Sequence, residues 1–216
     1  NQVLKFNIKK NNFKCGDRIL VTKQKNNREV WIKDWINYYN TKYNIDTIVI
    51  FDNNTEKEMS NKLCKSLNNN ISKFIPYNYN FGIPGVHHSG MLQVELMSIA
   101  KYQFCKANVL YFNFDIDELL QIPNNKLNKL LLEANNKLNI NFLEWSVPVS
   151  IKPTGNYSFK DFKYKNKEPS KKGYATKYVT NIDRDKNVEL GVHTAEKHFP
   201  KKFLNDFFLH YRGLNI

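Results

Sequence analysis

The chain has 216 residues, 41% of them hydrophobic and 14% aromatic, which suits one large α/β domain spanning residues 1–216 better than two small ones. No apolar run approaches the roughly 20 residues that a membrane-spanning helix needs, and the N-terminus shows no signal-peptide pattern. Thirty-three Lys and Arg against twenty Asp and Glu give a net charge of +13, which favours attraction to phosphates, nucleic acid or anionic lipid surfaces.

The three cysteines, Cys15, Cys64 and Cys105, are odd in number and widely spaced along the chain. They lack the close pairing that is typical of a zinc site. We therefore expect reduced thiols and a cytoplasmic protein. Its basic surface would favour peripheral association with the inner face of a membrane.

The first part of the chain alternates between strand-like and helix-like segments. Residues 18–22 predict a short buried strand, which a polar loop at 23–28 follows. Residues 29–43 predict a helix whose aromatic positions recur at helical spacing, so these rings are expected in the core. The β-branched run 47–51 predicts a parallel strand buried on both faces, and a polar turn at 52–54 ends it.

The alternation continues with a helix at 57–67, a strand at 71–76, a helix at 91–105 and a strand that starts at Val109. This order predicts an α/β fold with a mainly parallel central sheet flanked by helices. Ligands of such sheets collect beyond the carboxyl ends of the strands. Three polar segments, 22–28, 52–54 and 115–118, are expected at that edge.

The second part of the chain has a different pattern. Residues 127–138 predict a helix and 141–151 a strand. The segment 152–173 is rich in Lys, Gly, Pro, Ser and aromatic residues, and we interpret it as a long loop that would serve as an acceptor loop or lid. Short strands are expected at 178–180, 192–193 and 207–211.

An apolar strand-like run from Val109 to Phe114 ends in three acids, Asp115, Asp117 and Glu118. Crowded carboxylates repel one another, and burial adds a desolvation cost, so a cation would stabilise them. In an extended strand Asp115 and Asp117 point to the same side, about 6.5 to 7 Å apart. One ion can engage both only if the strand ends and the backbone turns, or if one carboxylate acts through water. Mg²⁺ or Mn²⁺ held in this way commonly completes its shell with water and substrate phosphate oxygens. The alternative is that the acids cap a helix starting near Glu118.

The acidic segment and three other blocks together resemble a known family. An Asp-x-Asp after an apolar strand is similar to the motif of metal-dependent nucleotide-sugar glycosyltransferases with the GT-A fold, a Rossmann-like sandwich. More narrowly, four blocks in order resemble glycosyltransferase family 92 (DUF23-like) and the related glycosyltransferase 2-like group. These blocks are Glu29 to Ile36, Ile50 to Thr55, Phe114 to Leu119 and His210 to Arg212.

The resemblance implies a donor pocket that takes a nucleotide sugar, with a UDP-sugar favoured. Asp52 and Asn53 would meet the base or ribose. The loop that holds Thr22, Lys23 and Arg28 would line the same pocket. Residues 18–118 would form the nucleotide-sugar-binding half of the domain, and 119–216 the half that binds a glycan or lipid-linked glycan acceptor.

The resemblance also implies a site for Mn²⁺ or Mg²⁺. Asp117 would bind the metal directly, while Asp115 would touch the ribose or reach the metal through water. A late histidine on a strand, followed by an aromatic residue, would complete the site, and His210 suits that pattern best. His193 follows a short apolar segment and competes with His210 as a metal ligand.

An inverting transfer needs a carboxylate base within about 3 Å of the acceptor hydroxyl. The candidates are Glu144 and Asp161, with Glu196 as a third. Glu144 precedes Trp145, which would offer an aromatic platform to a sugar ring, and burial would raise the pKa of Glu144. In the alternative reading Trp145 is a core residue and Glu144 faces water.

Two other classes of function use the same features. A metal-dependent nucleotidyltransferase or phosphohydrolase also places clustered aspartates on phosphates, and it would release phosphate or pyrophosphate. A nucleic-acid-binding module would use the +13 charge, but it would need grouped basic and aromatic residues rather than aspartates. The favoured hypothesis is a glycosyltransferase of surface polysaccharide biosynthesis that has no nucleic-acid partner.

Overall fold

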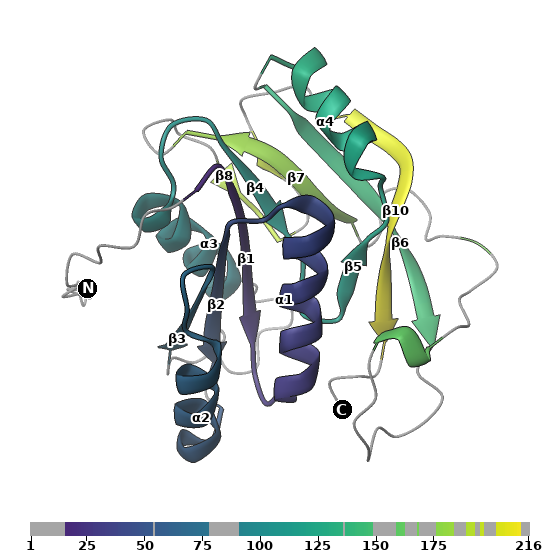
Figure 1. Ribbon diagram of the computed structural model, residues 1–216. Helices are drawn as coiled ribbons and strands as arrows, with labels where there is room; N and C mark the ends of the chain where they lie inside the picture. The colour runs from purple at the N-terminus through teal and green to yellow at the C-terminus, as the bar shows by residue number, and fades with distance from the viewer. Residues whose placement is uncertain are drawn as a thin grey trace.

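The computed structural model describes residues 16–53, 55–77, 91–135, 137–148, 159–162, 168, 176–183, 189–192, 195–196 and 202–212. Helices cover a central sheet (Figure 1). The helices are α1 (Glu29–Tyr43), α2 (Lys57–Leu67), α3 (Met91–Phe104), α4 (Asn124–Glu133) and the 3₁₀ turn η1 (Phe159–Asp161). The strands are β1 (Arg18–Gln24), β2 (Thr47–Asn53), β3 (Ser72–Tyr77), β4 (Val109–Asn113), β5 (Glu118–Leu120), β6 (Asn139–Pro148), β7 (Thr176–Ile182), β8 (Glu189–Leu190), β9 (Ala195–Glu196) and β10 (Lys202–Arg212).

The predicted helices and strands of the first part are confirmed. Helices α1 and α2 have the predicted bounds, and α3 ends one residue early. Strands β1 and β2 each continue two residues further than predicted and include Gln24 and Asn53, because they keep pairing with neighbouring strands there. The polar segments at 23–28 and 52–54 are therefore partly strand.

The second part differs more from the prediction. Helix α4 begins at Asn124, three residues before the predicted start, and ends at Glu133. Strand β6 begins at Asn139, while residues 149–151 lie outside the described ranges. The predicted strand at 192–193 is wrong for Val192, which lies in a bend between β8 and β9. Of the predicted loop at 152–173, the structure describes η1, Phe162 and Glu168.

The sheet has the strand order β3-β2-β1-β4-β7-β6-β10-β5. Four of its seven pairings are parallel, namely β1 with β2, β2 with β3, β1 with β4, and β6 with β10. The other three are antiparallel, because β7 enters between β4 and β6, and β5 pairs with β10 in the opposite direction. The α/β class is confirmed, but the sheet is partly antiparallel.

The strand order reverses between β1 and β4. From β1 the chain passes outward to β2 and β3 through α1 and α2, and it then crosses back to β4 through α3. Helices α1, α2 and α4 pack on one core and α3 packs on the other. Such a reversal leaves a crevice at the carboxyl ends of β1 and β4, where open α/β sheets bind ligands.

Aromatic side chains dominate the core between α1 and the sheet. Trp35, Tyr39 and Tyr43 are fully buried and Trp31 is 3% exposed, so the predicted core role of these helix aromatics is confirmed. Phe114, at the end of β4, has its ring centroid 5.6 Å from that of Tyr39 and 5.9 Å from that of Phe208. The residue that precedes the acidic segment is therefore fixed from both sides.

Tyrosines of α1 satisfy the backbone of the edge strand β5. An edge strand leaves N–H and C=O groups without strand partners. The Tyr39 hydroxyl donates to the Glu118 carbonyl at 3.0 Å and accepts from the Leu120 amide at 3.1 Å. The Tyr43 hydroxyl lies 2.6 Å from the Leu120 carbonyl, and Tyr38 donates to the same oxygen. The helix thereby holds the strand that begins at Glu118.

Replacing Tyr39 by Phe is expected to lower the free energy of unfolding by at least about 2 kcal/mol, because it leaves a buried amide and a buried carbonyl without partners. Tyr102→Phe is the matched control, since Tyr102 is 57% exposed. It should stay within about 0.5 kcal/mol of the wild type. Denaturant unfolding measures both, and equal effects at the two positions would contradict the role given to Tyr39.

No helix in the described ranges has the length and hydropathy needed to cross a membrane. Two of the three cysteines, Cys64 and Cys105, lie in those ranges, and neither forms a disulfide there; Cys64 is half-buried and Cys105 is buried.

Candidate functional site

The acidic segment is a turn at the carboxyl end of β4. The Glu118 amide donates to the Asp115 carbonyl at 3.0 Å, which closes the turn, and Glu118 begins β5. The Tyr211 amide donates to the Asp117 carbonyl at 2.9 Å and joins the turn to β10. The alternative that these acids cap a helix is therefore wrong, since Glu118 starts a strand, and the backbone turn is the condition under which one ion could engage Asp115 and Asp117.

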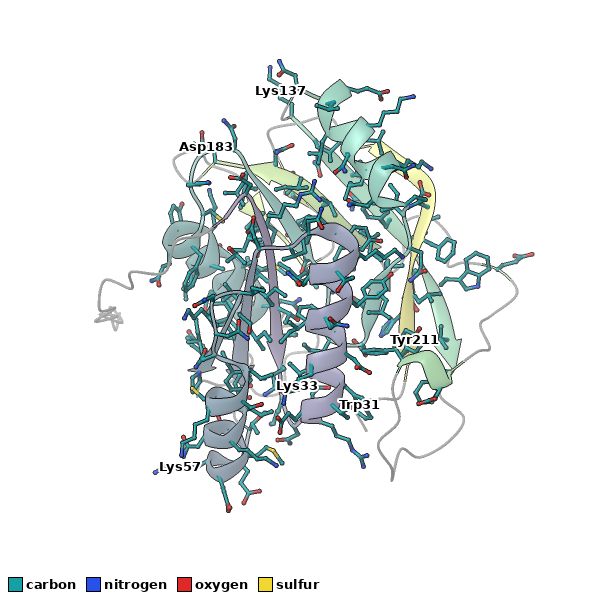
Figure 2. The ribbon with its side chains drawn as sticks, viewed as in Figure 1. Trp31, Lys33, Lys57, Lys137, Asp183 and Tyr211 are labelled. Carbon is teal, nitrogen blue, oxygen red and sulfur yellow. The ribbon has the colours of Figure 1, made fainter. Side chains whose placement is uncertain are left out.

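The turn lies where several strands meet at one edge of the sheet. The arrowheads of β1, β6 and β10 point to this edge in Figure 1. Strand β7 runs antiparallel to β4 and β6, so its first residues are also there. Figure 2 shows Trp31, near the start of α1, and Tyr211, near the end of β10, at the same end of the molecule.

Lys177 of β7 lies between two of the acids. Its side chain is 3% exposed, and its Nζ lies 2.7 Å from Asp115 Oδ2 and 3.2 Å from Glu118 Oε2. Glu118 Oε2 also accepts a hydrogen bond from the Asp115 amide at 2.7 Å. A buried ammonium thus provides a positive charge to two of the three acids.

The surrounding charges and burial shift the pKa values of Asp115 and Glu118 in opposite directions. Burial opposes ionisation of Asp115, but Lys177 and Lys23 outweigh it and lower the pKa of this carboxyl. Burial raises the pKa of Glu118 to about 8, because Lys177 only partly offsets it and the charges of Asp115 and Asp117 add repulsion. Asp115 is therefore the ionised partner of Lys177 at neutral pH.

His210 lies between Asp117 and Glu144. Its Nε2 is 3.3 Å from Asp117 Oδ2, and its Nδ1 is 3.3 Å from Glu144 Oε1, close enough for an ion pair with either carboxylate. Burial opposes protonation, yet the two carboxylates raise the pKa of His210 to about 10. The two carboxylates therefore favour the protonated ring.

Glu144 is fully buried beneath this histidine. Its Oε1 accepts a hydrogen bond from the Ser146 hydroxyl at 2.5 Å. The alternation of a strand puts Trp145 on the opposite face, where its ring centroid is 4.5 Å from that of Phe207. Glu144 does not face water, and Trp145 is half-buried rather than a core residue, so that alternative reading is wrong on both counts.

The end of β1 forms the other wall of the crevice. Thr22 and Lys23 line a small pocket together with Phe51 of β2 and with Gln93 and Met97 of α3. Burial lowers the pKa of Lys23 to about 8, although Asp115 partly offsets that effect. The amine of Lys23 therefore lies near the acidic turn, at the point where the strand order reverses.

Asp52 and Asn53 end β2 and are both buried. The Asp52 carboxylate accepts hydrogen bonds from Gln24 and Ser60, one on each oxygen. Gln24 also donates to the Thr55 hydroxyl at 3.1 Å. These contacts tie the end of β1 to β2 and to α2 and hold the Asp52 carboxylate in place.

The remaining predicted site residues have different positions. Arg28 caps the start of α1, with its guanidinium carbon 5.5 Å from the Trp31 ring centroid. Asp161 is exposed on η1, whose Phe159 packs against Tyr211 with ring centroids 4.9 Å apart. His193 lies outside the described residues.

The donor atoms of the turn suit a divalent cation whose coordination a substrate completes. Within the described residues, no group of three His, Cys, Asp or Glu side chains is arranged to hold a metal alone. Asp117 and His210 are nevertheless adjacent, and Asp115 Oδ1 is buried without a hydrogen-bond partner in those ranges. Carboxylate and imidazole are ligands of Mn²⁺, and phosphate oxygens commonly complete such a shell.

Sequence reasoning missed Lys177. It precedes a predicted strand at 178–180, and nothing in its own neighbourhood distinguishes it from the many other lysines. The signal lies in the pairing of β7 with β4, which brings the start of one strand to the end of the other. Periodicity predicts the strand but not its partner.

No family model matches the chain, and no curated protein matches it. Among solved structures it is similar to TarS of S. aureus, with 12% identity and a TM-score of 0.42 over 65% of this chain and 23% of that one. It is also similar to the Mn/GDP form of core-mannan synthase A (CmsA/Ktr4) of Aspergillus fumigatus, with 10% identity and a TM-score of 0.33 over 59% and 42%. A third is the mannosyltransferase Ktr4p of S. cerevisiae in complex with GDP, with 8% identity and a TM-score of 0.32 over 66% and 45%.

The chain spans less than half the length of each of these three structures. Similarity this low establishes neither family nor function, and the resemblance to family 92 gains no support from it. The functional argument therefore depends on the geometry of the site.

Proposed function

We propose that the chain is a glycosyltransferase domain that moves a sugar from a nucleotide diphosphate donor to a hydroxyl acceptor. The observation that carries the proposal is the acidic turn, in which Asp117 meets His210 at the carboxyl edge of the sheet. The turn follows β4, and the strand order reverses between β4 and β1, where α/β sheets bind nucleotides.

The donor would lie between the acidic turn and the end of β1. Thr22 and Lys23 would line its pocket, and the ammonium of Lys23 would meet the diphosphate. Asp52 and Asn53 would contact the base or ribose, with Asp52 held in place by Gln24 and Ser60. A UDP-sugar is the favoured donor, with residues 18–118 as the donor half.

Asp117 and His210 would hold Mn²⁺ or Mg²⁺, with Asp115 Oδ1 as a third ligand, directly or through water. When bound, the cation would neutralise the charge that develops on the departing diphosphate. His210 would bind it as a neutral imidazole, so metal binding would release a proton from the ring. His193 remains a proposed alternative ligand.

Glu144 would orient His210 rather than reach the acceptor. Its carboxylate is fully buried and lies 3.3 Å from His210 Nδ1, while the other ring nitrogen faces Asp117. Carboxylates behind ligating histidines commonly fix the orientation of the ring. The exposed Asp161 is the better candidate for the base that takes a proton from the acceptor hydroxyl.

Glu144→Gln is expected to weaken Mn²⁺ binding, measured in the presence of a nucleoside diphosphate, by about 10- to 100-fold. Glu133→Gln makes the same chemical change on a side chain that is 55% exposed, and it should leave the affinity unchanged. Isothermal titration measures both. An unchanged affinity in folded Glu144→Gln protein would contradict the positioning role.

The acceptor is proposed to be a glycan or lipid-linked glycan of a surface polysaccharide. Residues 119–216 would form the acceptor half of one domain. The net charge of +13 would favour association with an anionic membrane surface, where a lipid-linked acceptor would be found.

A panel of nucleotide sugars, incubated with and without Mn²⁺, tests the proposal. The expected product is the intact nucleoside diphosphate, formed by slow donor hydrolysis and faster when an acceptor is present. Release of phosphate or pyrophosphate would instead indicate a phosphohydrolase or nucleotidyltransferase. Failure of every donor to react or to stabilise the protein thermally would contradict the assignment.

A further inference from the structure

Lys177 has no role in the proposed transfer, yet it is among the most buried charged groups in the described ranges. It belongs to β7, where the strand pairs antiparallel with β4 and β6. The ammonium contacts Asp115 and Glu118, while Asp117 faces His210. The three acids of the turn are therefore divided between two different cationic side chains.

A buried carboxylate and a buried ammonium each have a large desolvation cost that only a close partner offsets. The 2.7 Å contact with Asp115 provides that partner, and the 3.2 Å contact with Glu118 draws the other end of the turn to the same nitrogen. Glu118 Oε2 also accepts from the Asp115 amide. The turn is thus closed around Lys177 by protein groups alone.

Lys177 contacts only one of the two carboxylate oxygens of Asp115. Lys177 occupies Oδ2 of Asp115, whereas Oδ1 of the same carboxylate has no hydrogen-bond partner in the described residues. A rotation of this carboxylate would break the contact with Lys177. The lysine therefore fixes the orientation of the Asp115 carboxylate, and with it which of the two oxygens lacks a hydrogen-bond partner in the described residues.

We propose that Lys177 is a positioning residue that acts as the permanent counter-ion of the acidic turn. It keeps Asp115 and Glu118 in place before any metal or donor binds, and it leaves Asp117 and Asp115 Oδ1 for the ligand. The statement about the ligand rests on the proposed function. The statement about the counter-ion does not.

Thermal unfolding of Lys177→Met protein, with EDTA or with Mn²⁺ and without donor, tests the inference. In EDTA the Tm should fall by at least about 6 °C, because the ionised Asp115 and the buried Glu118 lose their shared cationic neighbour. Mn²⁺ should recover at least half of that loss by entering the vacated position, and an electron paramagnetic resonance titration should detect the additional bound ion. The wild type should respond less to Mn²⁺.

Two further variants separate charge from packing. Lys33→Met changes a lysine whose side chain is 54% exposed and should behave as the wild type. Asp115→Asn combined with Lys177→Met removes both members of the closest pair and should be more stable in EDTA than Lys177→Met alone. If Lys177→Met does not fold, a folded double variant supports the inference and an unfolded one contradicts it.

A Lys177→Met protein that loses stability without recovery by Mn²⁺, and that Asp115→Asn does not improve, would overturn the proposal. These measurements need no donor, so their failure leaves the transfer reaction untouched. If the variants have the expected stabilities but no nucleoside diphosphate is released from any donor, that result would contradict the transfer reaction alone.

Discussion

Asp117→Asn protein is expected to fold normally and to lose at least about 10²-fold in kcat for sugar transfer. The carboxylate of Asp117 is the acid that faces His210, so its loss removes a ligand of the cation that would stabilise the leaving diphosphate. Initial rates at saturating donor, with Mn²⁺ varied, measure the effect. The loss should persist at high Mn²⁺ if the geometry of the bound ion is altered as well as its affinity.

Asp17→Asn is the matched control for that variant, because Asp17 has an 82% exposed side chain in a surface pair with Lys106. Exposed pairs of this kind contribute about 0–1 kcal/mol, and transfer should be unaffected. Undiminished transfer by Asp117→Asn protein would show that the acidic turn is not the catalytic centre.

Phe114→Ala is expected to give the largest loss of stability among single changes near the site. Phe114 is fully buried, and its ring contacts those of Tyr39, Phe142 and Phe208. Truncating a buried phenylalanine costs about 3–5 kcal/mol, since it removes apolar contacts and leaves a cavity. In a chain of this size the Tm should fall by about 6–20 °C.

The same change should weaken ligand binding, because Phe114 is the residue that fixes the start of the acidic turn. Leu132→Ala, at a side chain that is 82% exposed, should alter the free energy of unfolding by no more than about 0.5 kcal/mol. Urea unfolding of both variants, followed by Mn²⁺ titration of the folded proteins, checks the two effects. Equal stabilities would contradict the packing described for β4.

The sequence was sufficient to predict the helices and strands of the first part, because each has a clear physical signal. The aromatic residues of α1 recur at helical spacing, and the apolar run of β2 matches a strand covered on both faces. The ends of β1 and β2 were predicted too early, since Gln24 and Asp52 are polar residues that keep the strand pairing and bond to each other.

The antiparallel half of the sheet could not be predicted in the same way. Strands β7 and β10 were predicted as short segments, but periodicity contains no information on which strands pair. Because β7 lies between β4 and β6, Lys177 reaches an acid that is 62 residues away in sequence. The sequence pattern predicted a divalent cation at the acidic turn, which stays a prediction, and it did not predict the ammonium of Lys177 beside Asp115 and Glu118.

The position of His210 shows what a motif can and cannot predict. Its contact with Asp117 brings together two residues that the resemblance implied as metal ligands, and the ligand role itself stays a prediction. Its second neighbour, Glu144, was expected as an acceptor base because it precedes an aromatic residue. The Glu144 side chain is fully buried, so water does not reach it. That burial depends on the packing of β6 beside β10.

The most direct test is the anomalous diffraction of a crystal that contains Mn²⁺ and uridine or guanosine diphosphate. We expect a manganese peak against Asp117 and His210, beside the diphosphate, with the Lys177 ammonium still between Asp115 and Glu118. A diphosphate bound elsewhere, or a bound diphosphate at this edge without manganese against Asp117, would contradict the proposed site.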